Sequence, residues 1–431
     1  MDPMDQTTEA EGSHSSQRRR KWRLPPTFAA LQHRNYRLFF GGQLISLTGT
    51  WMQQMAQAWL VYQLTNSAFL LGLIGSIGSL PVFLLAVPGG VIADRKDKRH
   101  ILLATQSCLM VLALVLAGLT ATGWVRTWHV AVVAAMTGLV MAFDMPARQA
   151  FVVEMVGRSE LMNAIALNSS IFNSARIFGP AIAGVVVAGV GMAWCFFING
   201  LSFLAVLVGL LLMRFPPRKR EAKETGVLAG ALDGVHFLRR HPRVSGLVTL
   251  LGVFSIFGWS YSLLMPIFAR DILHSGPKGL GMLMTANGTG ALVGALLVAS
   301  LTYYPGRARI LFAGGFLFSV AISGFAFSRL FLLSAFLLAL AGLGGVSLMS
   351  TANTMIQISV PDELRGRIMG VWALVFAGSA PVGSFQAGTV AHYLGAPRAV
   401  LIGATITAIA TVSALLSRGR MRRQQTAAHI E

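Results

Sequence analysis

Polar and charged side chains inside apolar segments are the residues of this 431-residue chain that could do chemistry. Arg176 lies in such a segment, where an unpaired guanidinium costs on the order of several kcal/mol. Asn173 and Ser169 precede it at spacings that share one helix face. The pattern predicts either a contact with a polar or anionic ligand in a cavity, or a structural clamp on backbone carbonyls or on Asp144.

The other polar residues in apolar segments are mostly amides. Each could contact a ligand, although an amide in such a segment more often forms an interhelical hydrogen bond. The candidate cavity residues are Gln53, Gln57, Asn173, Arg176, Trp259, Asn287, Asn353 and Gln386. A lining of amides and aromatic rings suits a bulky, partly apolar small molecule.

Motifs of enzymes and of nucleotide-driven proteins are missing from the sequence. It contains no His-Glu-x-x-His, no Gly-x-Ser-x-Gly and no Gly-x-x-x-x-Gly-Lys-Ser/Thr pattern. Cys108 and Cys195 both lie in apolar runs, where a buried, unreactive thiol is expected. The sequence therefore predicts no enzymatic activity, no metal site and no cofactor.

Long apolar segments must position these residues. The chain is 54% hydrophobic and 12% charged, whereas about a quarter of a soluble domain is charged. Segments of about 20 apolar residues, enough to cross a bilayer as a helix, recur at 38–64, 68–93, 101–121, 127–145, 161–190, 192–212, 244–268, 279–301, 310–327, 330–356, 368–393 and 399–416. The pattern predicts an all-α membrane protein with twelve transmembrane helices.

The net charge of +19 raises the possibility of a nucleic-acid partner. Most of the 35 Lys and Arg, however, lie in the two tails and in every second connection between apolar segments. This asymmetry is typical of the cytoplasmic side of a membrane protein. It predicts that both termini are cytoplasmic, that the lipid bilayer is a partner, and that no nucleic acid is bound.

Two six-helix halves are indicated by a weak internal repeat. The pairs Glu160-Leu161 and Glu363-Leu364, and the pairs Leu71-Gly72 and Leu280-Gly281, are each separated by about 205 residues. Such pseudo-symmetric halves enclose the ligand site of many transporters. The predicted divisions are a disordered cytoplasmic tail at 1–24, a first half at 25–213, a cytoplasmic linker at 214–243, a second half at 244–417 and a cytoplasmic tail at 418–431.

The predicted linker contains a short apolar repeat. Leu228, Leu232 and Val235 have the spacing of one helix face. This spacing fits a surface helix at the membrane, and a solvated linker remains the alternative.

A charged motif follows the second apolar segment. Gly90, Asp94, Arg95, Lys98 and Arg99 read Gly-x-x-x-Asp-Arg-x-x-Lys-Arg, which resembles the Gly-x-x-x-Asp-Arg-x-Gly-Arg-Lys signature of the major facilitator superfamily. The glycine would permit close helix approach, and the aspartate would need a basic partner to offset its desolvation. This pair would act as a gate between the halves. The alternative is that these residues only anchor the chain at the cytoplasmic surface.

Asp97 stands where the family signature has its second glycine. That substitution puts the tight turn expected there in doubt.

Two further stretches resemble one branch of that superfamily. AFDMPARQAFVVE at 142–154 and NAIALNSSIFNSARIFGP at 163–180 are similar to the exporters that include the enterobactin exporter and macrolide efflux proteins. Gly179, Pro180 and Gly184 are similar to the glycine-proline motif of antiporters in the superfamily. There proline frees a backbone carbonyl and small residues let helices pack.

The resemblance implies a major facilitator fold and export of a small amphiphilic molecule, such as a siderophore or a macrolide-like drug, by alternating access. It also implies proton-coupled antiport, for which Asp144 is the candidate carrier, since it is the one acidic residue within a predicted helix. A monomer in the bacterial cytoplasmic membrane is expected. The alternatives are a nutrient importer and a non-transporting membrane scaffold or sensor.

Overall fold

The computed structural model describes residues 26–157, 159–214, 236–301 and 306–427, and these contain helices and no strand. The bounds of the elements, in chain order, are η1 Pro26–Gln32, α1 Arg34–Thr65, α2 Ala68–Arg95, α3 Lys98–Ala121, α4 Thr127–Val156, α5 Leu161–Gly189, α6 Met192–Leu212, α8 Pro242–Val253, η2 Phe254–Gly258, α9 Tyr261–Ile267, η3 Phe268–Ile272, α10 Gly276–Ser300, α11 Arg307–Phe327, α12 Phe331–Ser359, α13 Asp362–Leu394 and α14 Ala396–Ala427.

Eleven helical runs in these ranges are long and apolar enough to cross a membrane, and α8 to η3 count as one run, Pro242–Ile272. The remaining long helix, α1, has 32 residues and carries several glutamines. Large apolar side chains on outward faces, such as Val320 and Leu332, are exposed, as expected for contact with lipid. The chain is a multi-pass membrane protein, and the predicted all-α fold with twelve long helices is confirmed.

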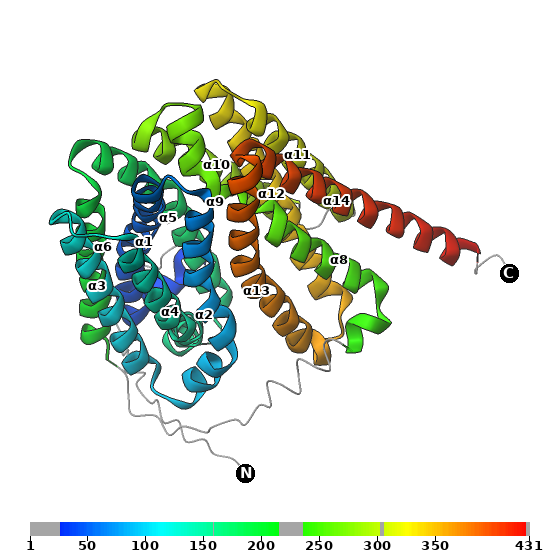
Figure 1. Ribbon diagram of the computed structural model, residues 1–431. Coiled ribbons are helices and arrows are strands. Elements are labelled where there is room, and N and C mark those ends of the chain that lie inside the picture. The colour runs from blue at the N-terminus through cyan, green and yellow to red at the C-terminus, as the bar shows by residue number, and fades with distance from the viewer. Residues whose placement is uncertain (1–25, 158, 215–235, 302–305, 428–431) are drawn as a thin grey trace, which may run out of the picture.

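The helices form two halves. In the first half α1 packs on α5 and α6, and α2 packs on α4; in the second half α12 packs on α10 and α11. Across the halves, α2 packs on α13 and α5 packs on α10. Figure 1 shows the halves meeting near α9 and α10 and diverging where α2 ends and α13 begins. We call the end with the α1–α2 connection the contact end, and the end with the α2–α3 connection the splayed end.

Glycines set the two crossings between the halves. A Cβ on Gly72 would lie 2.6 Å from the Cα of Gly388, and a Cβ on Gly281 would lie 3.0 Å from the Cα of Gly184. Gly72 and Gly281 are the residues that the internal repeat pairs. Each half therefore contributes an equivalent glycine where its second helix meets the fifth helix of the other half, which allows close backbone approach.

The end of α4 differs from its predicted position. The apolar segment was predicted to end at Met145, but α4 continues through Pro146 to Val156. Arg148 therefore lies inside the helix. It fits there because it forms an ion pair with Asp144 one turn earlier, so that neither charge is left alone.

The last helix, α14, extends to Ala427, beyond its predicted end at 416. The predicted tail at 1–24 and most of the predicted linker, Leu228, Leu232 and Val235 included, lie outside the described residues.

Candidate functional site

A cavity of about 510 Å³ lies in the middle of the bundle, mostly within the first half. Its apolar wall includes Ile74, Leu109 and Met141, and Leu263 and Ser384 reach it from the second half. Its polar wall includes Ser46, Thr50, Gln53, Gln54, Gln57, Thr137, Arg148 and Asn199. Among the described residues that line this central cavity, Arg148 alone is charged.

Behind Arg148 lies Asp144, whose side chain is fully buried. Its carboxylate accepts hydrogen bonds from the Thr105 hydroxyl and the Gln106 amide, each at 2.7 Å, and it pairs with Arg148. Arg148 also donates to the Gln43 side-chain oxygen at 2.8 Å. The carboxylate and the guanidinium neutralise each other at the edge of the cavity.

Arg148 was missed in the sequence because α4 was predicted to end before it. The four-residue spacing from Asp144 places both side chains on one helix face, and that signal could have identified the pair.

Arg176 bridges the two halves. It is 9% exposed, its guanidinium donates to the Asn287 side-chain oxygen at 2.9 Å, and its guanidinium carbon lies 5.1 Å from the centre of the Trp259 ring. Asn287 in turn donates to the Tyr261 hydroxyl at 2.6 Å. Within the described part of the chain, Arg176 has no ion pair. The predicted clamp on Asp144 is wrong, because that carboxylate pairs with Arg148.

Two π-helical segments, η2 and η3, interrupt the helical run that carries Trp259 and Tyr261. Single-turn π segments are common at functional sites. Trp259 directly follows η2, and Tyr261 begins α9. The extra residue in the turn changes which side chains face Arg176, and no pattern in the sequence indicates it.

The other predicted cavity residues lie elsewhere. The Asn173 amide donates to the Ser169 carbonyl at 2.8 Å, and Asn353 accepts from Gln357 at 3.4 Å. The side-chain oxygen of Gln386 is buried without a hydrogen-bond partner. Within the described residues, none of these three lines the central cavity.

The glycine-proline motif packs α5 on both halves. A Cβ on Gly179 would lie 2.5 Å from the Cβ of Trp51 on α1, and a Cβ on Gly184 would lie 3.1 Å from the carbonyl oxygen of Pro277 at the start of α10. Pro180 lacks an N–H, so the helix ladder around it is loosened. The Thr285 hydroxyl of α10 donates to the Ile177 carbonyl of α5 at 3.0 Å, which adds a polar contact between the halves.

The basic residues of the charged motif, at the splayed end, contact other residues of the first half. Lys98 pairs with Glu154 at 2.8 Å, and Arg99 donates to the carbonyls of Leu210 at 2.8 Å and Leu211 at 3.0 Å. Asp94 and Arg95 are exposed, and Asp94 has no ion pair among the described residues. Asp94 needs no basic partner in this conformation, because an exposed carboxylate is not desolvated.

The turn after α2 tolerates Asp97 in place of the signature glycine. Asp97 has a φ of −66° and caps α3 by accepting a hydrogen bond from the Arg99 backbone at 2.9 Å. Because the turn needs no positive φ, no glycine is required there.

The close helix approach that was predicted at Gly90 occurs at Gly89. A Cβ on Gly90 would meet nothing within 4 Å, whereas a Cβ on Gly89 would lie 2.1 Å from the Ala142 carbonyl oxygen of α4. We expect Gly89→Ala to lower the stability by about 1–3 kcal/mol through overpacking and Gly90→Ala to leave it unchanged. The melting temperatures of the two purified variants test this, and equal melting temperatures would contradict it.

A polar cluster closes the contact end. The Tyr62 hydroxyl of the first half donates to the Asp271 carboxylate of the second. Arg270 donates to the Tyr62 carbonyl at 3.4 Å, and its guanidinium carbon lies 5.4 Å from the centre of the Tyr62 ring. The halves are therefore tied together at one end and separate at the other.

Comparison with known proteins gives curated relatives of similar length. The staphyloferrin A transporter of Staphylococcus aureus is 25% identical over 84% of this chain and 90% of its own length. The multidrug efflux pump Tap of Mycolicibacterium fortuitum is 27% identical over 79% of this chain and 85% of its own. The enterobactin exporter EntS of Shigella boydii is 29% identical over 79% and 81%.

Solved structures share the fold. A bacterial homologue of the human lysosomal transporter Spinster, in an inward-facing and occupied conformation, aligns with a TM-score of 0.71 at 13% identity, over 90% of this chain and 97% of its own. A family model described as transmembrane secretion effector matches residues 26–430. The chain therefore belongs to the transmembrane secretion effector family of the major facilitator superfamily, and it is a membrane transporter and not an enzyme.

Proposed function

We propose that this transporter exports a small amphiphilic molecule, such as a siderophore, a macrolide-like drug or a related metabolite, across the bacterial cytoplasmic membrane. The observation that carries the proposal is the central cavity of about 510 Å³, which combines aliphatic side chains and methionines with neutral amides and hydroxyls. Such a lining suits a cargo with both apolar and hydrogen-bonding parts. The relatives named for siderophore and multidrug transport support it.

The transporter works by alternating access as a monomer, with the splayed end toward the cytoplasm. Arg95, Lys96, Lys98 and Arg99 all belong to the α2–α3 region at that end, and basic residues favour the cytoplasmic side. In this orientation the conformation described here is the one that loads cargo. The tail residues and both termini are then cytoplasmic.

Export proceeds in exchange for protons, and Asp144 carries the proton. Its neutral pairing with Arg148 supports this assignment, because protonation of the carboxylate would leave Arg148 as an uncompensated positive charge on the cavity wall. The protonation state and the affinity for cargo are then linked. Gln53 and Gln57 offer hydrogen bonds to the cargo, while Arg176, Trp259 and Asn287 join the halves.

Accumulation of an amphiphilic dye and of siderophores in efflux-deficient cells tests the function. Expression of the protein is expected to lower accumulation, and a protonophore is expected to restore it. Thr137→Trp should abolish the effect because it fills the central cavity from α4. Met136→Trp is the matched control, since Met136 is 42% exposed on the outer face of the same helix.

Two outcomes would count against the proposal. Raised accumulation on expression would indicate uptake. Equal activity of Thr137→Trp and Met136→Trp would show that cargo does not pass through this cavity.

A further inference from the structure

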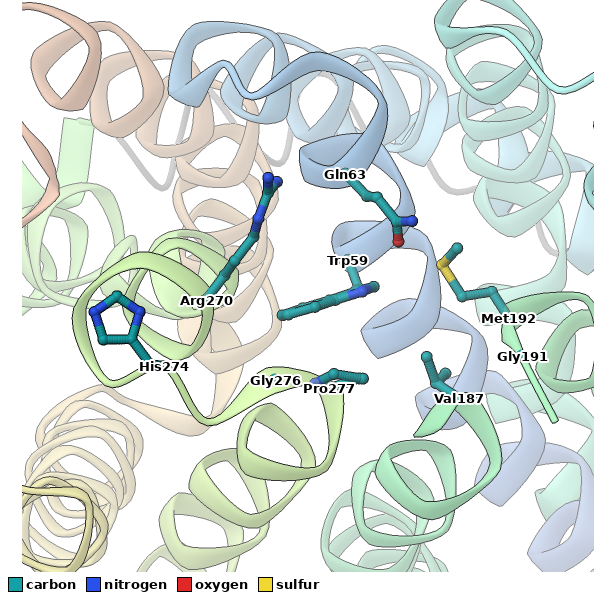
Figure 2. Close-up of a pocket in the computed structure, with 9 residues that line it drawn as sticks. All are labelled: Trp59, Gln63, Val187, Gly191, Met192, Arg270, His274, Gly276 and Pro277. Atoms are coloured by element: carbon teal, nitrogen blue, oxygen red, sulfur yellow. The ribbon is translucent and has the colours of Figure 1, made fainter. Parts of the chain in front are cut away.

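A second cavity, of about 650 Å³, lies at the contact end, and we call it the outer cavity. Trp59 and Gln63 of α1 and Met192 of α6 line it from the first half, and Arg270, His274 and Pro277 line it from the second half. Figure 2 shows that these residues come from three separate segments, with the Trp59 ring lying across the middle and the His274 ring turned away from it. A molecule bound there would touch both halves at once.

The outer cavity attracts negative charge. Arg270 and His274 line it, and no acidic side chain is among the described residues that do. Two helices also begin at its edge: α6 after Gly191 and α10 after Ser275, and neither has a side-chain cap. Free backbone N–H groups at a helix start carry partial positive charge and favour anions. One of these helix starts belongs to each half.

Trp59 provides an aromatic surface and a hydrogen-bond donor. Its side chain is 8% exposed, and within the described part of the chain its indole N–H has no protein partner, so it can donate to a bound acceptor. The ring borders the outer cavity (Figure 2). An acceptor on a bound molecule would satisfy this donor while the apolar part of the molecule packs on the ring.

Asp271 pairs with Arg270 from outside the outer cavity, so it offsets the Arg270 charge only in part. Its carboxylate lies 3.7 Å from the Arg270 Nε and accepts the hydrogen bond of the Tyr62 hydroxyl. It faces the Tyr62 cluster and does not line the outer cavity. Nε of Arg270 faces Asp271 and Nη1 faces the Tyr62 carbonyl, so within the described residues Nη2 is the guanidinium nitrogen that can donate to a ligand.

His274 has a backbone conformation that is uncommon for residues other than glycine. Its φ is +47°, a region that costs energy for residues other than glycine and that is enriched at ligand sites. This turn holds the imidazole beside the start of α10, at the edge of the outer cavity.

We propose that the outer cavity binds a small amphiphilic organic anion, distinct from cargo in the central cavity, and that the bound anion holds the two halves together at the contact end. The aromatic or aliphatic part of the anion packs on Trp59, Met192 and Pro277. Its charged group takes hydrogen bonds from Arg270 and from the helix starts. Since only a conformation with the contact end closed has this site, binding shifts the population toward that conformation.

A pair of matched dyes tests the binding. 8-Anilinonaphthalene-1-sulfonate and N-phenyl-1-naphthylamine share one ring system, and only the first carries a sulfonate. Binding to the purified full chain in phosphatidylcholine nanodiscs is measured by energy transfer from tryptophan. The sulfonate dye is expected to bind at least about tenfold more tightly than the neutral dye, as a charge-assisted hydrogen bond predicts.

Variants assign the site. Arg270→Gln is expected to remove the preference for the sulfonate dye and to leave the affinity for the neutral dye unchanged. His274→Asn keeps a residue tolerant of positive φ and is expected to reduce the preference for the sulfonate dye in part. Arg329→Gln removes an exposed charge from the same end of the bundle and should change nothing. Equal affinity for the two dyes, or equal effects of Arg270→Gln and Arg329→Gln, would overturn the proposal.

Two further measurements identify the source of the anion and test whether it holds the two halves together. If phosphatidylglycerol in the nanodisc competes with the sulfonate dye in the wild type and in Arg329→Gln alike, an anionic lipid headgroup is the natural occupant; without competition, a soluble anion is. The sulfonate dye is expected to slow hydrogen exchange in residues 59–66 and 268–277. Binding without this protection would refute the proposal that the anion holds the halves together. None of these measurements requires transport, so their failure leaves the proposed export untouched.

Discussion

Replacing Arg176 with alanine is expected to reduce transport at least tenfold and to lower the melting temperature of the protein. The guanidinium links α5 to Asn287 of α10 and to the face of Trp259, which follows η2. Its loss leaves the Asn287 oxygen buried without a donor, which costs about 1–3 kcal/mol. The contact end should then open too easily. Dye export from cells and thermal unfolding of the purified variant measure the two effects.

Two companion variants separate charge from geometry. Arg176→Lys keeps the charge but loses the planar stacking on Trp259, so an intermediate loss of transport is expected. Asn287→Asp places a carboxylate against Arg176 and is expected to slow transport, because a new ion pair would hold the halves together. Normal transport in Arg176→Ala, with only stability lost, would reduce Arg176 to a structural clamp.

The long helices could be predicted because, in the described part of the chain, all of them except α1 are long and apolar enough to cross a bilayer on their own. The segment at 192–212 coincides with α6. The internal repeat also corresponds to a feature of the structure, because Gly72 and Gly281 lie at equivalent helix crossings between the halves. These features depend on local composition or on repetition along the chain, which a single sequence records.

Contacts between distant segments could not be predicted. Arg176 and Asn287 are 111 residues apart, and nothing local to either selects the other. The same holds for Tyr62 and Asp271, which are separated by 209 residues. The sequence identified Arg176 as a residue that must find a partner, but only the packing of α5 on α10 identifies that partner.

Arg148 and Arg176 differ in a way that only their surroundings reveal. Arg148 has a carboxylate partner on its own helix, so its positive charge is released only when Asp144 is protonated. Arg176 has only neutral partners, and they come from the other half. We infer that the first site responds to protons and that the second responds to the relative position of the halves.

Asp144→Asn is therefore expected to abolish proton-driven export while leaving exchange of cargo for cargo. The amide cannot lose a proton, so the step that links the proton gradient to the cavity is missing. It also leaves the half-buried Arg148 without a counter-charge, so the melting temperature should fall, by less than the removal of one partner from a fully buried ion pair would cause. Export into a pH gradient and counterflow at equal pH, both in proteoliposomes, separate the two activities.

The double variant Asp144→Asn with Arg148→Gln distinguishes coupling from stability. Two neutral amides can hydrogen-bond to each other and to Thr105, Gln106 and Gln43, so the double variant should recover most of the lost melting temperature. Proton-driven export should stay absent, since no titratable group is restored. If the double variant regained export driven by the pH gradient, Asp144 would have only a structural role, and the proton would have to be carried by another residue.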